Sequence, residues 1–174
     1  NEIAQSEAAN GKEFAKYWMH NGYLRINNEK MSKSLGNFIT IRAVSKEYDL
    51  GVLRFFMLGA HYRGPINFSH ELMEAAKTGL ERITNAVANL DFLLESANNR
   101  SLTEAEKEVS DKALAYKADF EAAMDADFNT ADAVTAVFNL VKLANSEINA
   151  ESSSELIKEV RGLIVLLSDV LGVK

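Results

Sequence analysis

The residues best suited to chemistry in this sequence are two lysines three positions apart, Lys30 and Lys33, which alternate with Met31, Ser32 and Ser34. A lysine ammonium is a compact charge on a flexible stem, so a pair of them can follow negative charge as it moves onto a leaving pyrophosphate. A glycine just downstream lets the backbone turn close by. By residue type alone, the same segment also fits a solvated surface loop.

The sequence around this lysine segment matches a known family in both order and spacing. With Leu35-Gly36-Asn37 directly after it, the segment resembles the KMSKS signature of class I aminoacyl-tRNA synthetases. Six further stretches narrow the resemblance to the cysteinyl-tRNA synthetases and extend it over essentially the whole chain: residues 1–7, 17–22, 53–56, 61–63, 67–69 and 123–130. The combination is more specific than any one stretch.

The resemblance implies an ATP-dependent ligase with Mg²⁺ accompanying ATP, in which L-cysteine becomes cysteinyl-adenylate and is transferred to tRNA(Cys). In that family the second lysine of the motif, here Lys33, acts on ATP while the α-phosphate is attacked, and Lys30 helps it. Pyrophosphate leaves in this step, and ammonium groups placed where its charge develops lower the barrier. We therefore expect Lys30 and Lys33 to be catalytic, within an ATP-binding segment that runs from Lys30 to Ser34.

Glu2 reads as an ordinary surface carboxylate, and only the resemblance gives it a function. Cysteinyl-tRNA synthetases hold zinc with two cysteines, a histidine and a glutamate, and the glutamate aligns with Glu2. Zinc explains how cysteine is told from serine, because soft sulfur outcompetes a hydroxyl at this metal. The other three ligands are absent from this sequence, so we expect Zn²⁺ in the parent enzyme and not on this chain alone.

Two aromatic residues between these sites, Trp18 and His20, align with the floor of the amino-acid pocket in the same family. The alternative, from residue type, is a tryptophan packed under a strand and a histidine hydrogen-bonded to backbone. Asp125, Asp127 and Asn129 have the spacing of a calcium loop, but the glycine and the closing glutamate of such a loop are missing. We expect a turn between two helices there.

His61, Tyr62 and Arg63 follow an apolar stretch and precede the only proline of the chain. We expect them to pack at the junction between two parts of the protein. A contact between Arg63 and tRNA is the alternative.

Composition sets the broad class of the protein. With 174 residues and 47% hydrophobic residues, the chain can bury a sizeable core. No run of about 20 apolar residues and no charged-then-apolar leader is present, which predicts a soluble protein without a membrane partner. The lack of cysteine fits a reducing compartment, and we expect the cytoplasm. A start at Asn1, inside an apparent motif, predicts a piece of a longer protein.

Charge is divided unevenly along the chain. The net charge is −6, but residues 1–70 hold nine Lys/Arg and six Asp/Glu, whereas residues 71–174 hold ten and nineteen. Only the first part has the sign that favours phosphate, and it also contains the lysine segment.

In the first part, residues 3–9 read as the end of a helix that stops at Asn10-Gly11. β-forming residues between 17 and 26 predict a short strand or hairpin, with Asn27-Asn28 as its turn. Thr40 and Asp49 are N-cap candidates for helices over residues 41–48 and 50–60. The second of these is apolar nearly all round, so we expect it to be buried between layers.

Beyond Gly64-Pro65 the apolar period is helical throughout. Four N-caps predict four helices that begin at Ser69, at Thr103 with Glu106 in a capping box, at Thr130 or Asn129, and at Ser152 with Glu155. The stripe of the first helix comprises Leu72, Ala76, Leu80, Ile83, Val87, Leu90 and Leu94.

We therefore expect a mainly α fold: the end of a Rossmann-type class I catalytic domain, with a short strand or hairpin plus helices, over residues 1–66, then an antiparallel four-helix bundle over 67–174. The resemblance makes the bundle a DALR-type domain on the tRNA-binding side, and makes the isolated chain an inactive part of its parent enzyme. One alternative is a cysteine ligase that transfers the adenylate to an amino-sugar acceptor. The other, a non-catalytic helical RNA-binding module, is disfavoured by the acidic second part.

Overall fold

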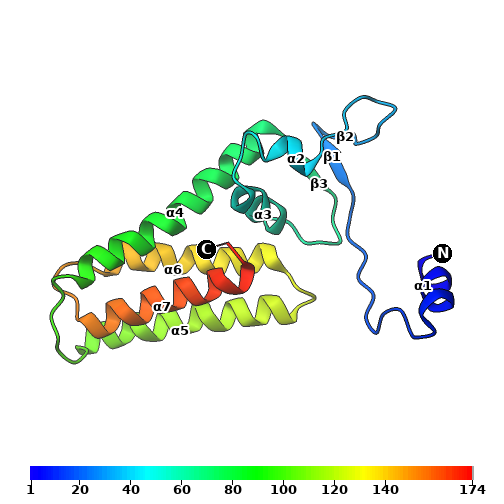
Figure 1. Cartoon of the computed structure of the whole chain (residues 1–174). Coiled ribbons are helices and arrows are strands. Elements are labelled where there is room, and N and C mark those ends of the chain that lie inside the picture. Colours follow the sequence, from blue (N-terminus) through cyan, green and yellow to red (C-terminus); the bar gives the residue numbers. More distant parts are fainter. Residues whose placement is uncertain (174) are drawn as a thin grey trace.

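One long helix joins the two parts of the molecule. The structure is a computed structural model that describes residues 1–173, which form seven helices and three strands. Helix α4 (His70–Leu94) packs near its start against α3 (Leu50–Leu58) and farther along against α6 (Thr130–Glu147) and α7 (Ser154–Leu171). Helices α4, α6 and α7, together with α5 (Glu104–Asp125), form an antiparallel four-helix bundle (Figure 1). The predicted mainly α fold class is confirmed.

The small sheet lies beside the start of α4 and is built on a hairpin. Strand β1 (Leu24–Ile26) pairs antiparallel with β2 (Glu29–Lys30) and parallel with β3 (Ile66–Phe68), in the order β2-β1-β3. Asn27 and Asn28 form the two-residue turn with φ of 49° and 68°, a left-handed conformation that asparagine tolerates. The hairpin and its turn were predicted from the sequence, but β3 was not, because its partner lies about forty residues away.

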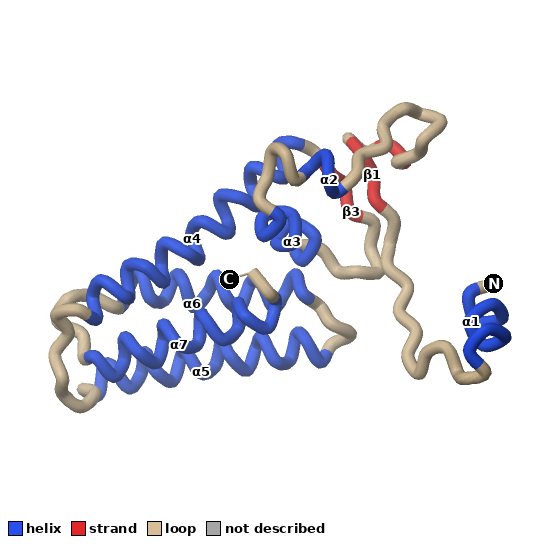
Figure 2. Tube along the Cα trace, in the orientation of Figure 1, coloured by secondary structure: helices blue, strands red, loops and turns tan. Residues whose placement is uncertain are grey.

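Helix α1 (Glu2–Asn10) lies apart from the rest of the molecule and buries none of its residues. It ends at Gly11, whose φ of 62° is the left-handed conformation expected of the residue after a helix. Figure 2 shows the extended segment of residues 11–23 that joins α1 to the sheet. The predicted helix end is confirmed, whereas strand structure begins only at Leu24 and not at Tyr17.

Two capped helices follow the hairpin. Thr40 accepts a hydrogen bond from the Ala43 amide at the start of α2 (Ile41–Val44), and Asp49 accepts one from Gly51 at the start of α3. Both predicted caps are therefore confirmed. Helix α2 is shorter than predicted because residues 45–48 continue as a turn.

The expectation that α3 is buried on all sides is wrong. Val52 and Phe55 are buried, but Leu50 and Met57 are 53% and 44% exposed. Helix α4 covers one side of α3, and the opposite side faces an open cavity beside the sheet. An apolar composition alone could not distinguish a covered face from an uncovered one.

The first helix of the bundle begins where predicted, but its buried face differs from the predicted apolar stripe at one position. Ser69 accepts a hydrogen bond from the Leu72 amide, which confirms the cap. The Met73 side chain is fully buried while Leu72 is 42% exposed, so the predicted stripe is wrong at its first position. Met73 belongs to a small second core with Val44 and Val52, which draws this end of α4 toward α2 and α3.

Of the three later caps, that of α5 is as predicted, that of α6 is the second of two predicted candidates, and that of α7 differs by one residue. Helix α5 has the predicted capping box of Thr103 and Glu106. Helix α6 is capped by Asn129, the alternative to Thr130, and α7 by Ser153 in place of Ser152. Ser152 instead accepts a hydrogen bond from the Asn149 amide, which closes the preceding turn.

Two polar contacts tie the ends of the bundle. Glu106 accepts hydrogen bonds from the Thr103 and Ser153 amides and from both terminal nitrogens of Arg100, so it joins the starts of α5 and α7. At the other end, the Arg54 Nε of α3 donates to the Leu171 carbonyl at 2.7 Å. These contacts satisfy groups that helix termini leave without partners.

Candidate active site

The lysine segment forms a loop between β2 and α2 that is held by the side chain of Asn37. Asn37 Oδ1 accepts a hydrogen bond from the Ser32 amide at 2.9 Å, and its Nδ2 donates to the Lys30 carbonyl at 3.1 Å. Gly36, with φ of 69°, makes the turn that brings Asn37 back to Lys30. One amide side chain therefore joins the two ends of the loop.

The ammonium group of Lys33, at the tip of the loop, is exposed to solvent. Ser32 Oγ accepts a hydrogen bond from the Leu35 amide at 3.2 Å and lies 3.1 Å from Ser34 Oγ, so both serines help to shape the turn. The Lys33 Nζ lies 5.6 Å from the centre of the Phe38 ring. Within residues 1–173 no carboxylate forms an ion pair with Lys33. A weak cation–π contact is easily exchanged for a phosphate.

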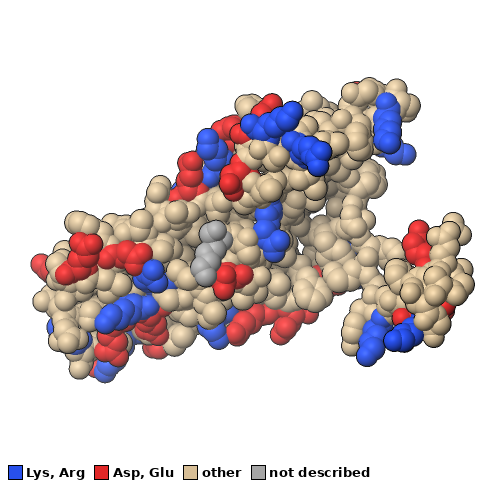
Figure 3. Space-filling view, viewed as in Figure 1, with Lys and Arg blue, Asp and Glu red and all other residues tan. Residues whose placement is uncertain are grey.

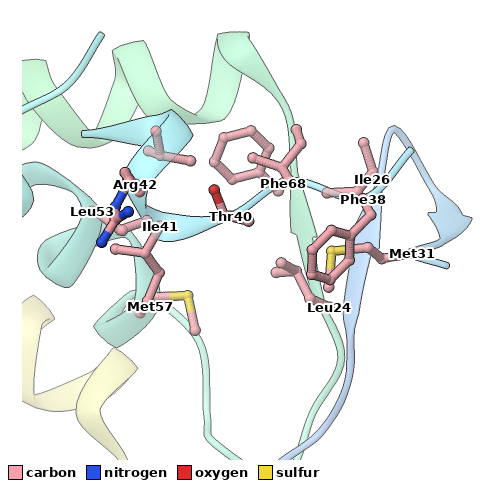
Figure 4. Close-up of a pocket in the computed structure, with 12 residues that line it drawn as sticks. Leu24, Ile26, Met31, Phe38, Thr40, Ile41, Arg42, Leu53, Met57 and Phe68 are labelled. Carbon is pink, nitrogen blue, oxygen red and sulfur yellow. The ribbon is translucent and has the colours of Figure 1, made fainter. Parts of the chain in front are cut away.

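Beneath the loop lies an almost wholly apolar cavity of about 580 Å³ between the sheet, α2 and α3. Figure 4 shows Met31 and Phe38, from the two ends of the loop, beside Leu24 of β1. Their side chains hold the loop ends on the sheet by apolar contact, while its tip lies free. Met31 belongs to the predicted ATP-binding segment, and here its side chain lines the apolar cavity.

The predicted metal and amino-acid residues lie away from this loop. Glu2 is exposed on α1, and its carboxylate lies 3.5 Å from the terminal amine of Asn1. Among the described residues no group of three or more His, Cys, Asp or Glu is placed to hold a metal ion. A single carboxylate does not fit zinc, which needs four ligands, so the donor set on this chain is insufficient by itself.

The two aromatic candidates lie on the extended segment before the sheet. Trp18 is 48% exposed, and its ring packs 5.5 Å from Phe14 and 6.5 Å from His20. The alternative of a tryptophan packed under a strand does not hold in this structure. Their assignment to an amino-acid pocket stays a prediction.

Comparison with known proteins relates these features to one family. Residues 1–78 match the model of the class I (C) tRNA synthetase catalytic domain, and residues 119–173 match the DALR domain. The chain is 59% identical over 174 residues to the cysteine–tRNA ligase of Lachnospira eligens and 52% identical over 173 residues to that of Clostridioides difficile. Over its whole length the chain is similar to cysteine–tRNA ligases.

The chain spans only 37% of the length of these two ligases, although the alignments include at least 99% of its own residues. Among solved structures it is similar to the LeuRS of Agrobacterium radiobacter K84, crystallised as a ternary complex with tRNA and LeuAMS, with a TM-score of 0.71. That match covers 85% of this chain and 20% of the LeuRS chain at 22% identity, so it supports the fold alone.

A second polar site lies where the loop after α3 meets the turn between α5 and α6. Asp127 accepts hydrogen bonds from Arg63 Nε at 2.5 Å and from the Tyr62 hydroxyl at 2.8 Å, and His61 Nε2 lies 3.9 Å away. These contacts, first with Arg63 and then with Tyr62, lower the pKa of Asp127 to about 2. The predicted junction packing of residues 61–63 is confirmed, and Asp127 lies in a helix-to-helix turn.

The loop at this junction also touches the segment that enters the sheet. The Gly22 amide donates to the Tyr62 carbonyl at 2.6 Å, and a Cβ at Gly22 would lie 2.0 Å from the Gly64 carbonyl oxygen. Only glycine fits there. The contact of Asp127 with Tyr62 and Arg63 was not predicted from the sequence. Asp127 and Phe128, both left-handed, nevertheless lie in the stretch 123–130, one of the six that narrowed the resemblance.

None of the described helices has the length and apolar character needed to cross a membrane.

Proposed function

We propose that this chain supplies the lysine loop and the helical domain of a cysteine–tRNA ligase that uses ATP with Mg²⁺ to activate L-cysteine and transfers it to tRNA(Cys) in the cytoplasm. The observation that supports this most strongly is the similarity to cysteine–tRNA ligases along the whole chain, at 50–59% identity. All three of these relatives have that name, so the amino-sugar ligase and the RNA-binding module gain no support. Zn²⁺ stays a prediction for the whole enzyme.

The geometry of the loop suits the expected step. A carboxylate oxygen of cysteine attacks the α-phosphorus of ATP, the bond from that phosphorus to the bridging oxygen breaks, and pyrophosphate leaves with the electron pair. Lys33 lies at the exposed tip of the loop, whose ends are held by Asn37, Met31 and Phe38, so it is placed to move with the departing charge. Lys30, which ends β2, supplies a second and less mobile charge.

The division of the chain into residues 1–66 and 67–174 stays part of this proposal. The catalytic-domain match ends at residue 78, inside α4, and the DALR match begins at 119, inside α5. Helix α4 contributes residues both to the core of the bundle and to the small core with α2 and α3. We therefore propose that this helix belongs to both domains.

The test is cysteine-dependent ATP–pyrophosphate exchange by the full-length ligase with Lys33→Ala. Removal of one electrostatic partner of a transition state typically costs about 100- to 1,000-fold in turnover, so we expect a loss of that size with a much smaller change in KM for ATP. Lys46→Ala, an exposed lysine in the turn after α2, is the matched control. An exchange rate that Lys33→Ala leaves unchanged would refute the assignment.

A further inference from the structure

The two faces of the small sheet differ completely in character. Side chains alternate along β1, and Leu24 and Ile26 line the apolar cavity, so Arg25 lies on the opposite face. Tyr23 precedes it by two residues and lies on the same face. The Arg25 Nη2 donates to the Tyr23 hydroxyl at 3.3 Å, and its guanidinium carbon lies 5.5 Å from the ring centre.

The strand register places Arg25 directly opposite Lys30. Residues paired in this way in an antiparallel ladder have Cβ atoms about 4.5–5.5 Å apart on one face, and like charges there repel each other. Glu29 pairs with Ile26, and therefore lies on the other face. The repulsion between Arg25 and Lys30 is thus not relieved by the neighbouring carboxylate.

Neither cation has a counterion within the part of the chain that the structure describes. No carboxylate oxygen of residues 1–173 lies within 4.0 Å of a side-chain nitrogen of Arg25 or Lys30. Four of the other six arginines, by contrast, bond to a carboxylate or a backbone carbonyl: Arg54, Arg63, Arg100 and Arg161 donate to Leu171, Asp127, Glu106 and Asp91. In Figure 3 the blue side chains at the loop end of the molecule have no red beside them, whereas over the bundle the two colours mix.

These residues surround a hollow that has room for a ligand. Tyr23, Arg25, Asn28 and Lys30, which we call the basic face, line a cavity of about 680 Å³. Asn28 is fixed by its amide, which donates to Asn67 Oδ1 at 2.6 Å. Two unpaired cations with a planar guanidinium fork are suited to a phosphate group, and Tyr23 holds that fork in place.

We propose that Arg25, together with Lys30, binds the β- and γ-phosphates of ATP and the pyrophosphate that leaves, and this rests on the proposed function. Lys30 connects the basic face to the lysine loop, because it is both the partner of Arg25 and the first residue of the loop motif. Arg25 lies in the central strand of the sheet, so it offers a fixed charge. Lys33, on the tip, offers a mobile one.

The experiment uses the full-length ligase and measures KM for pyrophosphate and for ATP in exchange, and KM for tRNA in aminoacylation. We expect Arg25→Gln to raise both KM values in exchange about ten-fold and to leave KM for tRNA within two-fold of wild type. Arg25→Lys keeps the charge but loses the fork of the guanidinium group. Its KM values for pyrophosphate and ATP should therefore lie between those of wild type and those of Arg25→Gln. Lys46→Gln is the control and should leave all three values unchanged.

A second, milder variant keeps Arg25 and therefore tests the proposal even if Arg25→Gln does not fold. Tyr23→Phe removes only the hydroxyl that receives the Arg25 hydrogen bond, and we expect a two- to three-fold rise in KM for pyrophosphate. Unchanged KM values for pyrophosphate and ATP in Arg25→Gln would overturn the proposal, as would an effect confined to KM for tRNA, which would assign the basic face to RNA phosphates. If the wild-type ligase showed no cysteine-dependent exchange, the proposed function itself would fail, which is a separate result.

Discussion

Lys30 and Lys33 belong to one motif but are restrained to different degrees. The Lys30 backbone is fixed by pairing with Arg25 and by the Asn37 side chain, whereas Lys33 lies in the turn with only the Phe38 ring beside its ammonium. The side chain of Asn37 therefore sets the path on which Lys33 can move. A loop that must close over a ligand needs fixed ends more than a fixed tip.

This reasoning predicts the effect of Asn37→Ala in the full-length ligase. The variant loses two hydrogen bonds, each with a net contribution of about 0.5–1.5 kcal/mol, and the loop ends separate. We expect the maximal exchange rate to fall about ten-fold while KM for cysteine stays unchanged. Asn85→Ala, on an exposed position of α4, should have no effect. If both variants behaved alike, Asn37 would not shape the loop.

Glu106 is the residue that links stability to pH. Its hydrogen bonds from Arg100, together with those from the Thr103 and Ser153 amides, lower its pKa from 4.5 to about 2 although burial acts in the opposite direction. A carboxylate whose pKa is lower in the folded state stabilises the protein above its unfolded pKa. That stabilisation is lost as the pH falls from about 4.5 through 2.

We accordingly predict that Glu106→Gln lowers the free energy of unfolding of the 174-residue chain by roughly 2–3 kcal/mol at pH 7. Most of the difference from wild type should disappear between pH 4.5 and pH 2 in urea melts. Glu104→Gln is the matched control on the same helical turn, because its exposed ion pair with Lys107 contributes well under about 1 kcal/mol. A constant difference between Glu106→Gln and wild type across this range would contradict the linkage.

Among the elements, the α5–α6 turn connects the bundle to the sheet. Asp127 receives hydrogen bonds from Tyr62 and Arg63, and the backbone of the same loop holds Gly22 at the entrance to β1. The contact is half exposed, so its effect on overall stability is small, but it sets the position of two elements relative to each other.

We predict that Asp127→Ala has at least the effect of Arg63→Ala, because Asp127 also bonds to Tyr62, and that the double variant is no worse than Asp127→Ala alone, since the two residues act through one contact. Under the proposed function, aminoacylation by the full-length ligase should fall more than ATP–pyrophosphate exchange, because only aminoacylation requires the enzyme to position tRNA. Lys46→Ala, in the exposed turn after α2, serves as the control. Fully additive effects of the two substitutions would show that they do not act through each other.

The molecule has two hydrophobic cores, a closed one in the helical bundle and a smaller one that is partly open to solvent. The bundle buries most of its apolar stripes between four helices, at roughly 1.5–3 kcal/mol for each large side chain. The second core is small and opens to the cavity beside the sheet, where Ile41 is 69% and Met57 44% exposed. Contiguous exposed apolar surface of this kind favours association.

For the 174-residue chain alone we predict a cooperative thermal melt, no ATP–pyrophosphate exchange, and self-association that increases with concentration in sedimentation velocity. Exchange is absent because the lysine loop has no bound ATP to close upon. Ile41→Ser should reduce self-association, whereas Leu166→Ser, at a half-exposed position on the bundle, should not. Measurable exchange, or a monomer at every concentration, would each contradict one part of this prediction.

The sequence by itself determined the features that depend on near neighbours along the chain. The caps at Thr40, Asp49, Ser69 and Thr103, the left-handed helix end at Gly11 and the left-handed turn at Asn27-Asn28 all follow from residues within about four positions of one another. Helical periodicity is equally local, which is why the four-helix bundle could be predicted from apolar spacing.

Tertiary structure alone decided which apolar face is covered and which charged side chains meet. Met73 replaced Leu72 in the core, and α3 kept an open side, because both depend on how α2, α3 and α4 pack. The pairing of Arg25 with Lys30 required a strand register, and the contact of Arg63 with Asp127 joined residues 64 positions apart. Periodicity places a side chain on a face of its own element, but only the packing of distant elements determines what that face meets.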